Sequence, residues 1–383
     1  MTKKHDFLLN KDIYFFNNGS YGACPRKVFE SYQKWQREIE YQPVEFYQKK
    51  LLPELKKSRQ IIAEFINAHD NDLILIRNAT YAVNTIIRSL DLTVKDEVLI
   101  TDQEYGACRN AWLFWQQEKG FKLSTIEIAL PLPDENTLIK LFESRITSKT
   151  KVVFFSHISS FTAQLFPAEK ICTLARKHRV LSIVDGAHAI GQITIDMQKI
   201  NADFYFSNLH KWMFSPKGTA FLYTRPALQK AIKPLITGWG WGRNRELKSG
   251  SDYVDSNLFY GTSDLSSFLT IEDSFRFYKD NDIIKKKQQC NALAKHFLQE
   301  MSKITGLKPL YEEFPSELML AVVEVPKKYS AEELKNILLN NYKIEVPVIE
   351  WNNKLMIRIS VQVYNTKEDV EYFLKTLRLI FNT

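Results

Sequence analysis

Apolar side chains recur with helical spacing in the first quarter of the chain. One segment places five side chains at successive intervals of four, three, four and three residues: Leu51, Leu55, Ser58, Ile62 and Phe65. A second helix is predicted after Asn78-Ala79-Thr80, where the same period links Val83, Ile86, Ile87 and Leu90. These spacings give a helix one apolar face, so both segments are expected to cover a core.

Short apolar runs alternate with helical patterns between about residues 50 and 225. Strands are predicted at residues 97–100, 151–155, 181–184, 204–206 and 219–223, with further helices at 107–118 and 167–178. The runs are continuous rather than alternating in polarity, which is typical of a mostly parallel sheet covered by helices on both faces. Ligands bind such sheets beyond the carboxyl ends of the strands.

The pattern changes after about residue 235. Residues 237–257 are rich in glycine and polar side chains, and a helix is predicted at 265–278. The remaining chain predicts a strand at 318–325, a helix at 331–340, a strand at 354–360 and a closing helix at 367–381. We therefore expect two domains: a large α/β domain over residues 14–250 and a small α+β domain over residues 251–383, with residues 1–13 packing against the small domain.

The composition argues against several classes of function. Of the 383 residues, 45% are hydrophobic and 25% charged, and no apolar stretch approaches the length that spans a membrane. The net charge of +8 comes from scattered lysines, so we expect no nucleic-acid partner. The four cysteines show no Cys-x-x-Cys pair and the histidines no His-Glu-x-x-His, so no metal site is expected. The N-terminus shows no signal-peptide pattern, and together these features predict a cytoplasmic protein.

Two polar residues stand where they favour a particular chemistry. Lys211 lies in a run of large apolar side chains, and Asp185, 26 positions earlier (211 − 185), ends the apolar run 181–184. A pyridoxal phosphate enzyme needs such a pair, because a desolvated lysine forms the Schiff base and a carboxylate keeps the pyridine nitrogen protonated. Either residue alone could instead be a surface lysine or an aspartate that caps the next helix.

Three further signals fit the same site. Asn78-Ala79-Thr80 opens a helix, where free N–H groups favour a phosphate, although an ordinary N-cap has the same sequence. Tyr105 stands at a strand-to-helix turn, either to stack on a flat ring or as a plain loop residue. Arg358, in an apolar strand, could hold a carboxylate bidentately or form a structural salt bridge.

Taken together, these segments resemble the class V aminotransferase superfamily of fold-type I pyridoxal phosphate enzymes, and most of all its isopenicillin N epimerase-like branch. The resemblance runs from about residue 14 to the C-terminus. Seven segments carry it: Asn17 to Pro25, Arg77 to Thr80, Glu104 to Ala107, Asp185 to Ala189, Asn208 to Trp212, Gly261-Thr262 and Arg358 to Thr366.

The resemblance implies a fold and a set of site residues. The large domain would be a doubly wound sheet that carries the cofactor, and the protein would be a homodimer with shared active sites. Lys211 would form the Schiff base and move the α-proton, Asp185 would hold the ring nitrogen, Tyr105 would stack on the ring, and His188 would lie near the ring hydroxyl. The phosphate would be held by Asn78, Ala79, Thr80, Asn208 and His210, with Gly261 and Thr262 of a second subunit. The α-carboxylate of an amino-acid substrate would bind Arg358, helped by Asn18 and Gly19.

Two positions depart from the pattern of the family. Ser263 stands where many relatives have arginine, and Ser160 stands where many have an asparagine near the ring hydroxyl, so by the resemblance Ser160 would be the corresponding cofactor ligand. The first departure puts a second-carboxylate or interface role at that position in doubt.

The reaction is left open between epimerisation, transamination and the elimination catalysed by a C–S lyase on a cysteine-derived substrate. Cysteine desulfurases of this superfamily attack with a loop cysteine, and residues 340–357 contain none. A catalytically silent binding module on the same fold is the other alternative, and the retention of both Asp185 and Lys211 argues against it.

Overall fold

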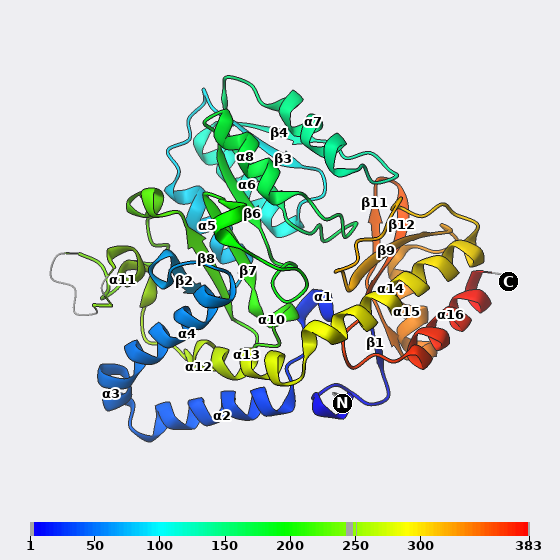
Figure 1. Cartoon of the computed structure of the whole chain (residues 1–383), viewed down its shortest axis with the longest axis horizontal. Coiled ribbons are helices and arrows are strands. Elements are labelled where there is room, and N and C mark those ends of the chain that lie inside the picture. The colour runs from blue at the N-terminus through cyan, green and yellow to red at the C-terminus, as the bar shows by residue number, and fades with distance from the viewer. Residues whose placement is uncertain (1–3, 243–247, 250, 382–383) are drawn as a thin grey trace.

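The computed structural model describes residues 4–242, 248–249 and 251–381. One large sheet and two small sheets are surrounded by helices (Figure 1). The strands are β1 (Tyr14–Phe15), β2 (Leu73–Ile76), β3 (Glu97–Thr101), β4 (Lys122–Ile126), β5 (Thr150–Ser156), β6 (Leu181–Asp185), β7 (Phe204–Asn208), β8 (Ala220–Thr224), β9 (Leu320–Val325), β10 (Ile344–Glu345), β11 (Val348–Trp351) and β12 (Lys354–Ser360).

The helices lie on both sides of the large sheet and on the small domain. They are α1 (Asn18–Tyr21), α2 (Arg26–Tyr41), α3 (Pro43–Glu45), α4 (Leu51–Phe65), α5 (Ala79–Ser89), α6 (Gly106–Lys119), α7 (Glu135–Arg145), α8 (Ala168–Lys177), α9 (Met197–Ile200), α10 (Leu209–Trp212), α11 (Asp252–Leu258), α12 (Ser266–Leu269), α13 (Ile271–Asp280), α14 (Ile283–Thr305), α15 (Ala331–Tyr342) and α16 (Lys367–Phe381). None of the described helices is long and apolar enough to cross a membrane.

The large sheet has the order β2-β8-β7-β6-β5-β3-β4. Strands β3 to β7 run parallel, and β8 is antiparallel to both β7 and β2. The predicted mostly parallel sheet is therefore confirmed. Strands β2 and β4 were missing from the prediction, because β2 is only four residues long and β4 is partly exposed at the sheet edge.

Alternate side chains of the strands enter two separate cores. In β5, Val153 and Phe155 pack into the core on one face, while Val152 and Phe154 pack into the core on the other. Because successive side chains of a strand point to opposite faces, continuous apolar runs are what a sheet buried on both faces requires. A core on each face of the sheet is the arrangement of a doubly wound α/β fold.

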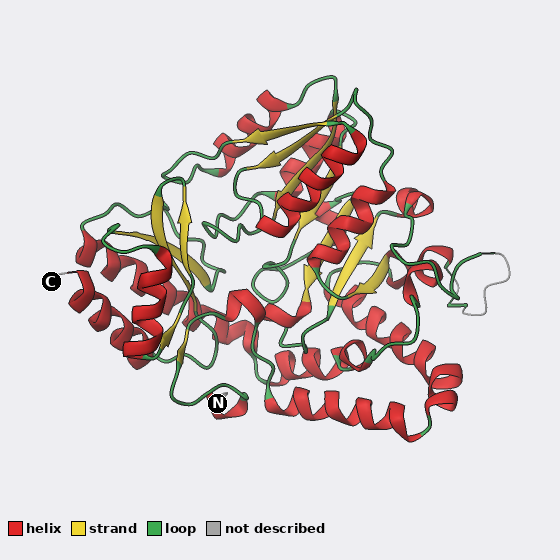
Figure 2. Cartoon of the chain, turned by 180° about the vertical axis from the view of Figure 1, so that it is seen from behind, coloured by secondary structure: helices red, strands yellow, loops and turns green. Residues whose placement is uncertain are grey.

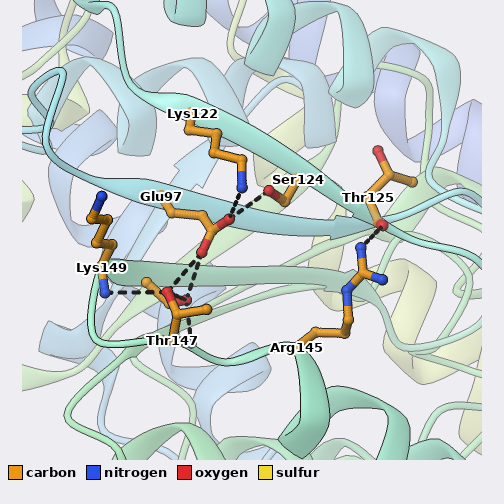
Figure 3. Close-up of polar contacts among 8 residues, drawn as sticks. Glu97, Lys122, Ser124, Thr125, Arg145, Thr147 and Lys149 are labelled. Atoms are coloured by element: carbon orange, nitrogen blue, oxygen red, sulfur yellow. Dashed lines mark hydrogen bonds and ion pairs between the residues drawn. The ribbon is translucent and has the colours of Figure 1, made fainter.

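Glu97, at the start of β3, joins the amino-terminal ends of three neighbouring strands (Figure 3). Its carboxylate accepts hydrogen bonds from Lys122 (2.8 Å) and Ser124 (2.6 Å) of β4. It also accepts from Thr147 (2.9 Å) and from Thr150 of β5 (3.1 Å). A buried charge with four donors stabilises this edge of the sheet.

In the small domain, helices pack onto an antiparallel sheet of order β11-β12-β9 (Figure 2). Helix α14 contacts both β9 and α16, and β1 pairs in parallel with β10. Of residues 1–13 the structure describes 4–13, in which Phe7 packs against Phe214, Phe277 and Tyr364. Residue 250, at the expected domain boundary, lies outside the described residues, so the division into 14–250 and 251–383 stays a prediction.

One predicted helix is interrupted. The segment 265–278 forms α12 and α13, separated at Thr270, whose hydroxyl donates a hydrogen bond of 2.7 Å to the carbonyl of Ser266. The backbone N–H of Thr270 keeps its bond to the same carbonyl (3.1 Å), and the interruption lies in the backbone of Thr270, with φ −85° and ψ −2°.

Candidate active site

The carboxyl ends of the parallel strands bring the candidate residues together. Asp185 is the last residue of β6, and Asn208 is the last of β7, directly before the short helix α10 that carries Lys211. Tyr105 precedes α6 at the same edge. The small domain contributes Arg358 of β12, whose guanidinium reaches Ser160 in the loop after β5.

Lys211 is buried, with 8% of its surface exposed. Its Nζ lies 3.2 Å from His188 Nε2 and 5.9 Å from the centroid of the Tyr105 ring. Burial and the charge of Arg358 lower the pKa of Lys211 to about 8, although Asp185 opposes the shift. At pH 7 roughly a tenth of the amine is then neutral and nucleophilic, far more than for an ordinary lysine, and the fraction rises toward pH 8.

Asp185 is buried without an ion-pair partner among the described residues. Its Oδ1 accepts a hydrogen bond from the Ala187 N–H (2.8 Å), and its Oδ2 accepts a weak one from the Cys108 thiol (3.3 Å). Burial raises the pKa of Asp185, so a cationic N–H near this carboxylate would stabilise its charged form. The carboxylate is suited to a protonated ring nitrogen.

Arg358 is also buried without an acidic partner in the described part of the chain. Its Nη1 donates to Ser160 O (2.8 Å) and Ser160 Oγ (3.0 Å), and its Nη2 donates to Ser20 Oγ (3.0 Å). Its Nε is buried and has no partner, and burial lowers the pKa of Arg358 to about 10. The structural salt bridge considered above is therefore absent among these residues, and the guanidinium is suited to a ligand carboxylate.

The predicted substrate residues Asn18 and Gly19 form part of α1, which packs on α10. Asn18 donates to the carbonyl of Lys211 (3.1 Å), and the Gly19 N–H donates to Ser360 Oγ (3.1 Å). A Cβ at Gly19 would lie 2.8 Å from Ser360 Oγ and 3.4 Å from the His188 ring, so a larger residue would require the Ser360 side chain or α1 to shift. The structure brings both residues beside the lysine, and their contact with a substrate stays a prediction.

The start of α5 has one free donor for a phosphate. Asn208 Oδ1 accepts from the Ala79 N–H (3.0 Å), and Asn78 Oδ1 accepts from the Tyr81 N–H (2.9 Å). No described residue accepts from the Thr80 N–H. His210, with a pKa lowered to about 4 by burial, is held by its Nδ1 at the Thr219 carbonyl (3.3 Å). Asn78 and Asn208 therefore act as caps in this structure, and phosphate contacts by all five predicted residues remain predictions.

Among the described residues, no hydrogen bond joins Gly261 or Thr262 to this site. The preceding Tyr260 accepts from Arg77 Nε (3.1 Å), so the segment lies beside the start of α5 in the same chain. Ser160, predicted as a cofactor ligand, accepts a hydrogen bond from Arg358 through its Oγ (3.0 Å). Whether Ser160 also contacts the cofactor stays a prediction.

The sequence did not single out three residues of the site: Ser20, Cys108 and Trp212. Ser20 and Trp212 belong to the segments that resemble the family, and Trp212 directly follows the lysine. Cys108 had no local signal, because only the packing of α6 on the sheet brings its thiol to Asp185.

These groups fit pyridoxal phosphate. The structure provides a buried nucleophilic amine, a buried carboxylate for the ring nitrogen, an aromatic ring over the amine and a free N–H at a helix start, where the dipole favours phosphate. Fold and donor set together define a fold-type I pyridoxal phosphate enzyme.

Comparison with known proteins agrees with this class. The chain matches the aminotransferase class-V family over residues 13–373 and belongs to that family, as the sequence motifs predicted. It is similar to the isopenicillin N epimerase of Amycolatopsis lactamdurans, with 27% identity over 381 residues that cover 97% of this chain and 96% of that protein. It is also similar to the hercynylcysteine sulfoxide lyase of Schizosaccharomyces pombe, with 28% identity over 382 residues, 98% of this chain and 96% of that protein.

A solved structure confirms the fold. A variant of C-DES, with glycine covalently linked to its pyridoxal phosphate cofactor, superposes with a TM-score of 0.86 at 19% identity, covering 99% of each chain. The predicted fold-type I architecture is therefore confirmed.

Proposed function

We propose that this protein uses pyridoxal phosphate to act at the α-carbon of an amino acid. The observation that carries the proposal is the position of Lys211, a buried amine with a pKa lowered to about 8, at the same sheet edge as the unpaired Asp185 and facing the unpaired Arg358. Arg358 would hold the substrate carboxylate, and the neutral amine of Lys211 would accept the α-proton.

Each residue has a distinct task in this proposal. Arg358 would hold the α-carboxylate through its unpaired Nε and the adjacent Nη2, while Ser160 and Ser20 keep the guanidinium in place. Neutral Lys211 Nζ would accept the α-proton and later return it. Bound pyridoxal phosphate supplies the electron sink for the pair left at the α-carbon. Tyr105, whose ring lies over the amine, would limit access of water on that side.

A C–S lyase acting on a cysteine-derived substrate is the second candidate. The name of the Schizosaccharomyces pombe relative supports it, and such an elimination needs no protein thiol. The cysteine nearest the site, Cys108, is unsuited as a nucleophile, because burial raises its thiol pKa well above the usual value and the thiol donates to Asp185. An epimerase or aminotransferase remains the first candidate, supported by the isopenicillin N epimerase relative.

We further propose a cytoplasmic homodimer with shared sites. Gly261 and Thr262 would reach the phosphate of the partner subunit, and the exposed indoles of Trp239 and Trp241 provide apolar surface nearby in the sequence. The four cysteines are all free, which suits a reducing compartment. Analytical ultracentrifugation, together with mixing of subunits inactivated at Lys211 or at Thr262, would test whether activity is restored in mixed dimers.

The test of the function has two stages. The purified protein should show the visible absorption of the cofactor, and borohydride should fix the pyridoxyl group to Lys211, as read by peptide mass. A label on another lysine would refute the assignment. L- and D-amino acids, with and without a keto-acid acceptor, should then yield the opposite enantiomer, a keto acid or a released sulfur product. These products distinguish epimerase, aminotransferase and lyase.

A further inference from the structure

Trp212 and His188 make a contact that restricts where protons can lie. The indole Nε1 of Trp212 donates a hydrogen bond of 3.3 Å to His188 Nδ1, and the two rings are inclined by 60°. An indole N–H can only donate, so His188 Nδ1 must be an unprotonated acceptor. Both side chains are buried, and no competing water or ion is needed to explain the contact.

The other ring nitrogen of His188 is then defined. A neutral imidazole with an unprotonated Nδ1 carries its proton on Nε2, and Nε2 lies 3.2 Å from Lys211 Nζ. A bond between these two atoms therefore runs from the imidazole to the amine. It requires a lone pair on Nζ, and an ammonium group, which has only donors, cannot accept it.

We infer that the indole of Trp212 fixes His188 as a hydrogen-bond donor to Lys211 and so favours the neutral form of the catalytic lysine. Trp212 is a positioning residue, because it acts through His188 rather than on a substrate. His188 is then no base for the α-proton, since losing Nε2–H while Trp212 occupies Nδ1 would leave an anionic ring. This inference rests on the proposed function only for its catalytic consequence.

Burial and the groups around His188 also favour its neutral form. Lys211, Arg358 and His210 face His188, and burial followed by these charges lowers the pKa of His188 well below its usual value. Around Lys211 itself, Arg358 disfavours the ammonium form, whereas Asp185 and Cys108 favour it. Substitution of Trp212 leaves all these groups in place, so a change in the variant reports on the indole.

The proton position can be observed directly in the full-length chain after removal of the cofactor. Long-range proton–nitrogen correlation of a sample with labelled histidines distinguishes a protonated from an unprotonated ring nitrogen. The His188→Gln variant identifies the His188 signals among those of the seven histidines. At neutral pH the parent should show an unprotonated Nδ1 and a protonated Nε2. A proton on Nδ1, or on both nitrogens, would overturn the inference whether or not any variant folds.

The Trp212→Phe variant then tests whether the indole N–H fixes the tautomer of His188. Without the indole N–H, both neutral tautomers become accessible, and the two nitrogen shifts of His188 should move toward each other. Trp112→Phe is the matched control, because Trp112 is equally buried but its Nε1 has no partner. Unchanged His188 signals in Trp212→Phe, or the same change in both variants, would contradict a specific role for Trp212.

The reactivity of the amine gives a second, independent measurement. Trace acylation of the cofactor-free chain at a series of pH values, quantified for the peptide of Lys211, gives the pKa of that amine. In Trp212→Phe the Nδ1–H tautomer lets Nε2 accept from the ammonium, so the pKa should rise by about one unit, a tenfold change in the ratio of the two forms. No rise, or a fall, would contradict the inference. Neither measurement involves turnover, so a wrong assignment of the reaction would leave both results intact.

Discussion

Buried carboxylates at the two ends of the central sheet have pKa values that are shifted in opposite directions. At the amino-terminal edge, burial alone would raise the pKa of Glu97, but bonds from Lys122, Ser124, Thr147 and Thr150 outweigh burial and lower the pKa to about 2 (Figure 3). At the carboxyl edge, burial raises the pKa of Asp185, and it raises that of Glu104 to about 8 despite bonds from Thr101 and Ser156.

The difference shows at which edge the protein's own donors compensate the buried charge. The donors around Glu97 compensate its charge, so this edge contributes to stability. Asp185 and Arg358 carry charges that no described residue neutralises, and Lys211 is held partly deprotonated. Unpaired buried charges cost stability and are typical of sites where a ligand supplies the missing partner. Substitutions at the two edges should therefore have opposite consequences for activity and stability.

Lys211→Ala should have the largest effect on activity. Loss of the amine that binds the cofactor and moves the proton should reduce turnover by at least about 10⁴-fold. The melting temperature of the cofactor-free chain should change little, because the buried amine has no ionic partner and the variant loses only its contact with His188. Lys122→Ala, at the other edge, should keep turnover and lose at most about 1 kcal/mol of stability. Measurable turnover near the parent rate in Lys211→Ala would disprove the assignment.

Asp185→Asn should reduce turnover by roughly 10³-fold, about 4 kcal/mol of barrier, because it keeps the shape and removes the charge. Cofactor binding should survive better than the rate, and the cofactor-free chain should melt no lower than the parent. Asp203→Asn is the comparison, since Asp203 is similarly buried but pairs with Arg225 at 2.5 Å. That variant should lose stability and keep its rate. Normal turnover in Asp185→Asn would refute the role.

Arg358→Lys should reduce kcat/KM for amino acids by roughly 10²-fold, because lysine keeps the charge but loses the planar fork. Methylamine, which has no carboxylate, should react with the bound cofactor at nearly the parent rate. Thermal melting should change little. If amines and amino acids were slowed alike, or the variant melted well below the parent, Arg358 would be structural.

Glu97→Gln should leave turnover unchanged and lower the free energy of unfolding by about 2 kcal/mol at pH 7, through loss of charge-assisted hydrogen bonds. The folded-state pKa of Glu97 is lowered to about 2, so its contribution is present above pH 4.5 and disappears as the pH falls toward 2. Urea denaturation of parent and variant at several pH values should show the difference shrinking in that window. The exposed Glu118, changed to glutamine, should show no such difference.

Much of this site could be predicted from local sequence. Asp185 directly follows the predicted strand 181–184, and Lys211 comes shortly after the predicted strand 204–206. The carboxyl ends of parallel strands meet at one edge, so the proximity of the two residues follows from the topology. The position of Ser160 did not follow, because its contact with Arg358 joins the loop after β5 to β12, 198 positions apart in the sequence. The thiol of Cys108 reached Asp185 in the same unforeseen way, through the packing of a helix on the sheet.

By itself, the sequence determined the parallel sheet, the apolar setting of Lys211 and the membership of a cofactor-dependent family, because periodicity and short motifs express local geometry. Only the tertiary structure decided which polar groups remain unpaired. The Asn208 side chain accepts from the Ala79 N–H at the start of α5, and Trp212 Nε1 donates to His188 Nδ1. Arg358 Nε is buried without a partner. Such pairings depend on distances between elements that a one-dimensional pattern does not contain, since each buried donor takes whichever acceptor the packing brings within reach.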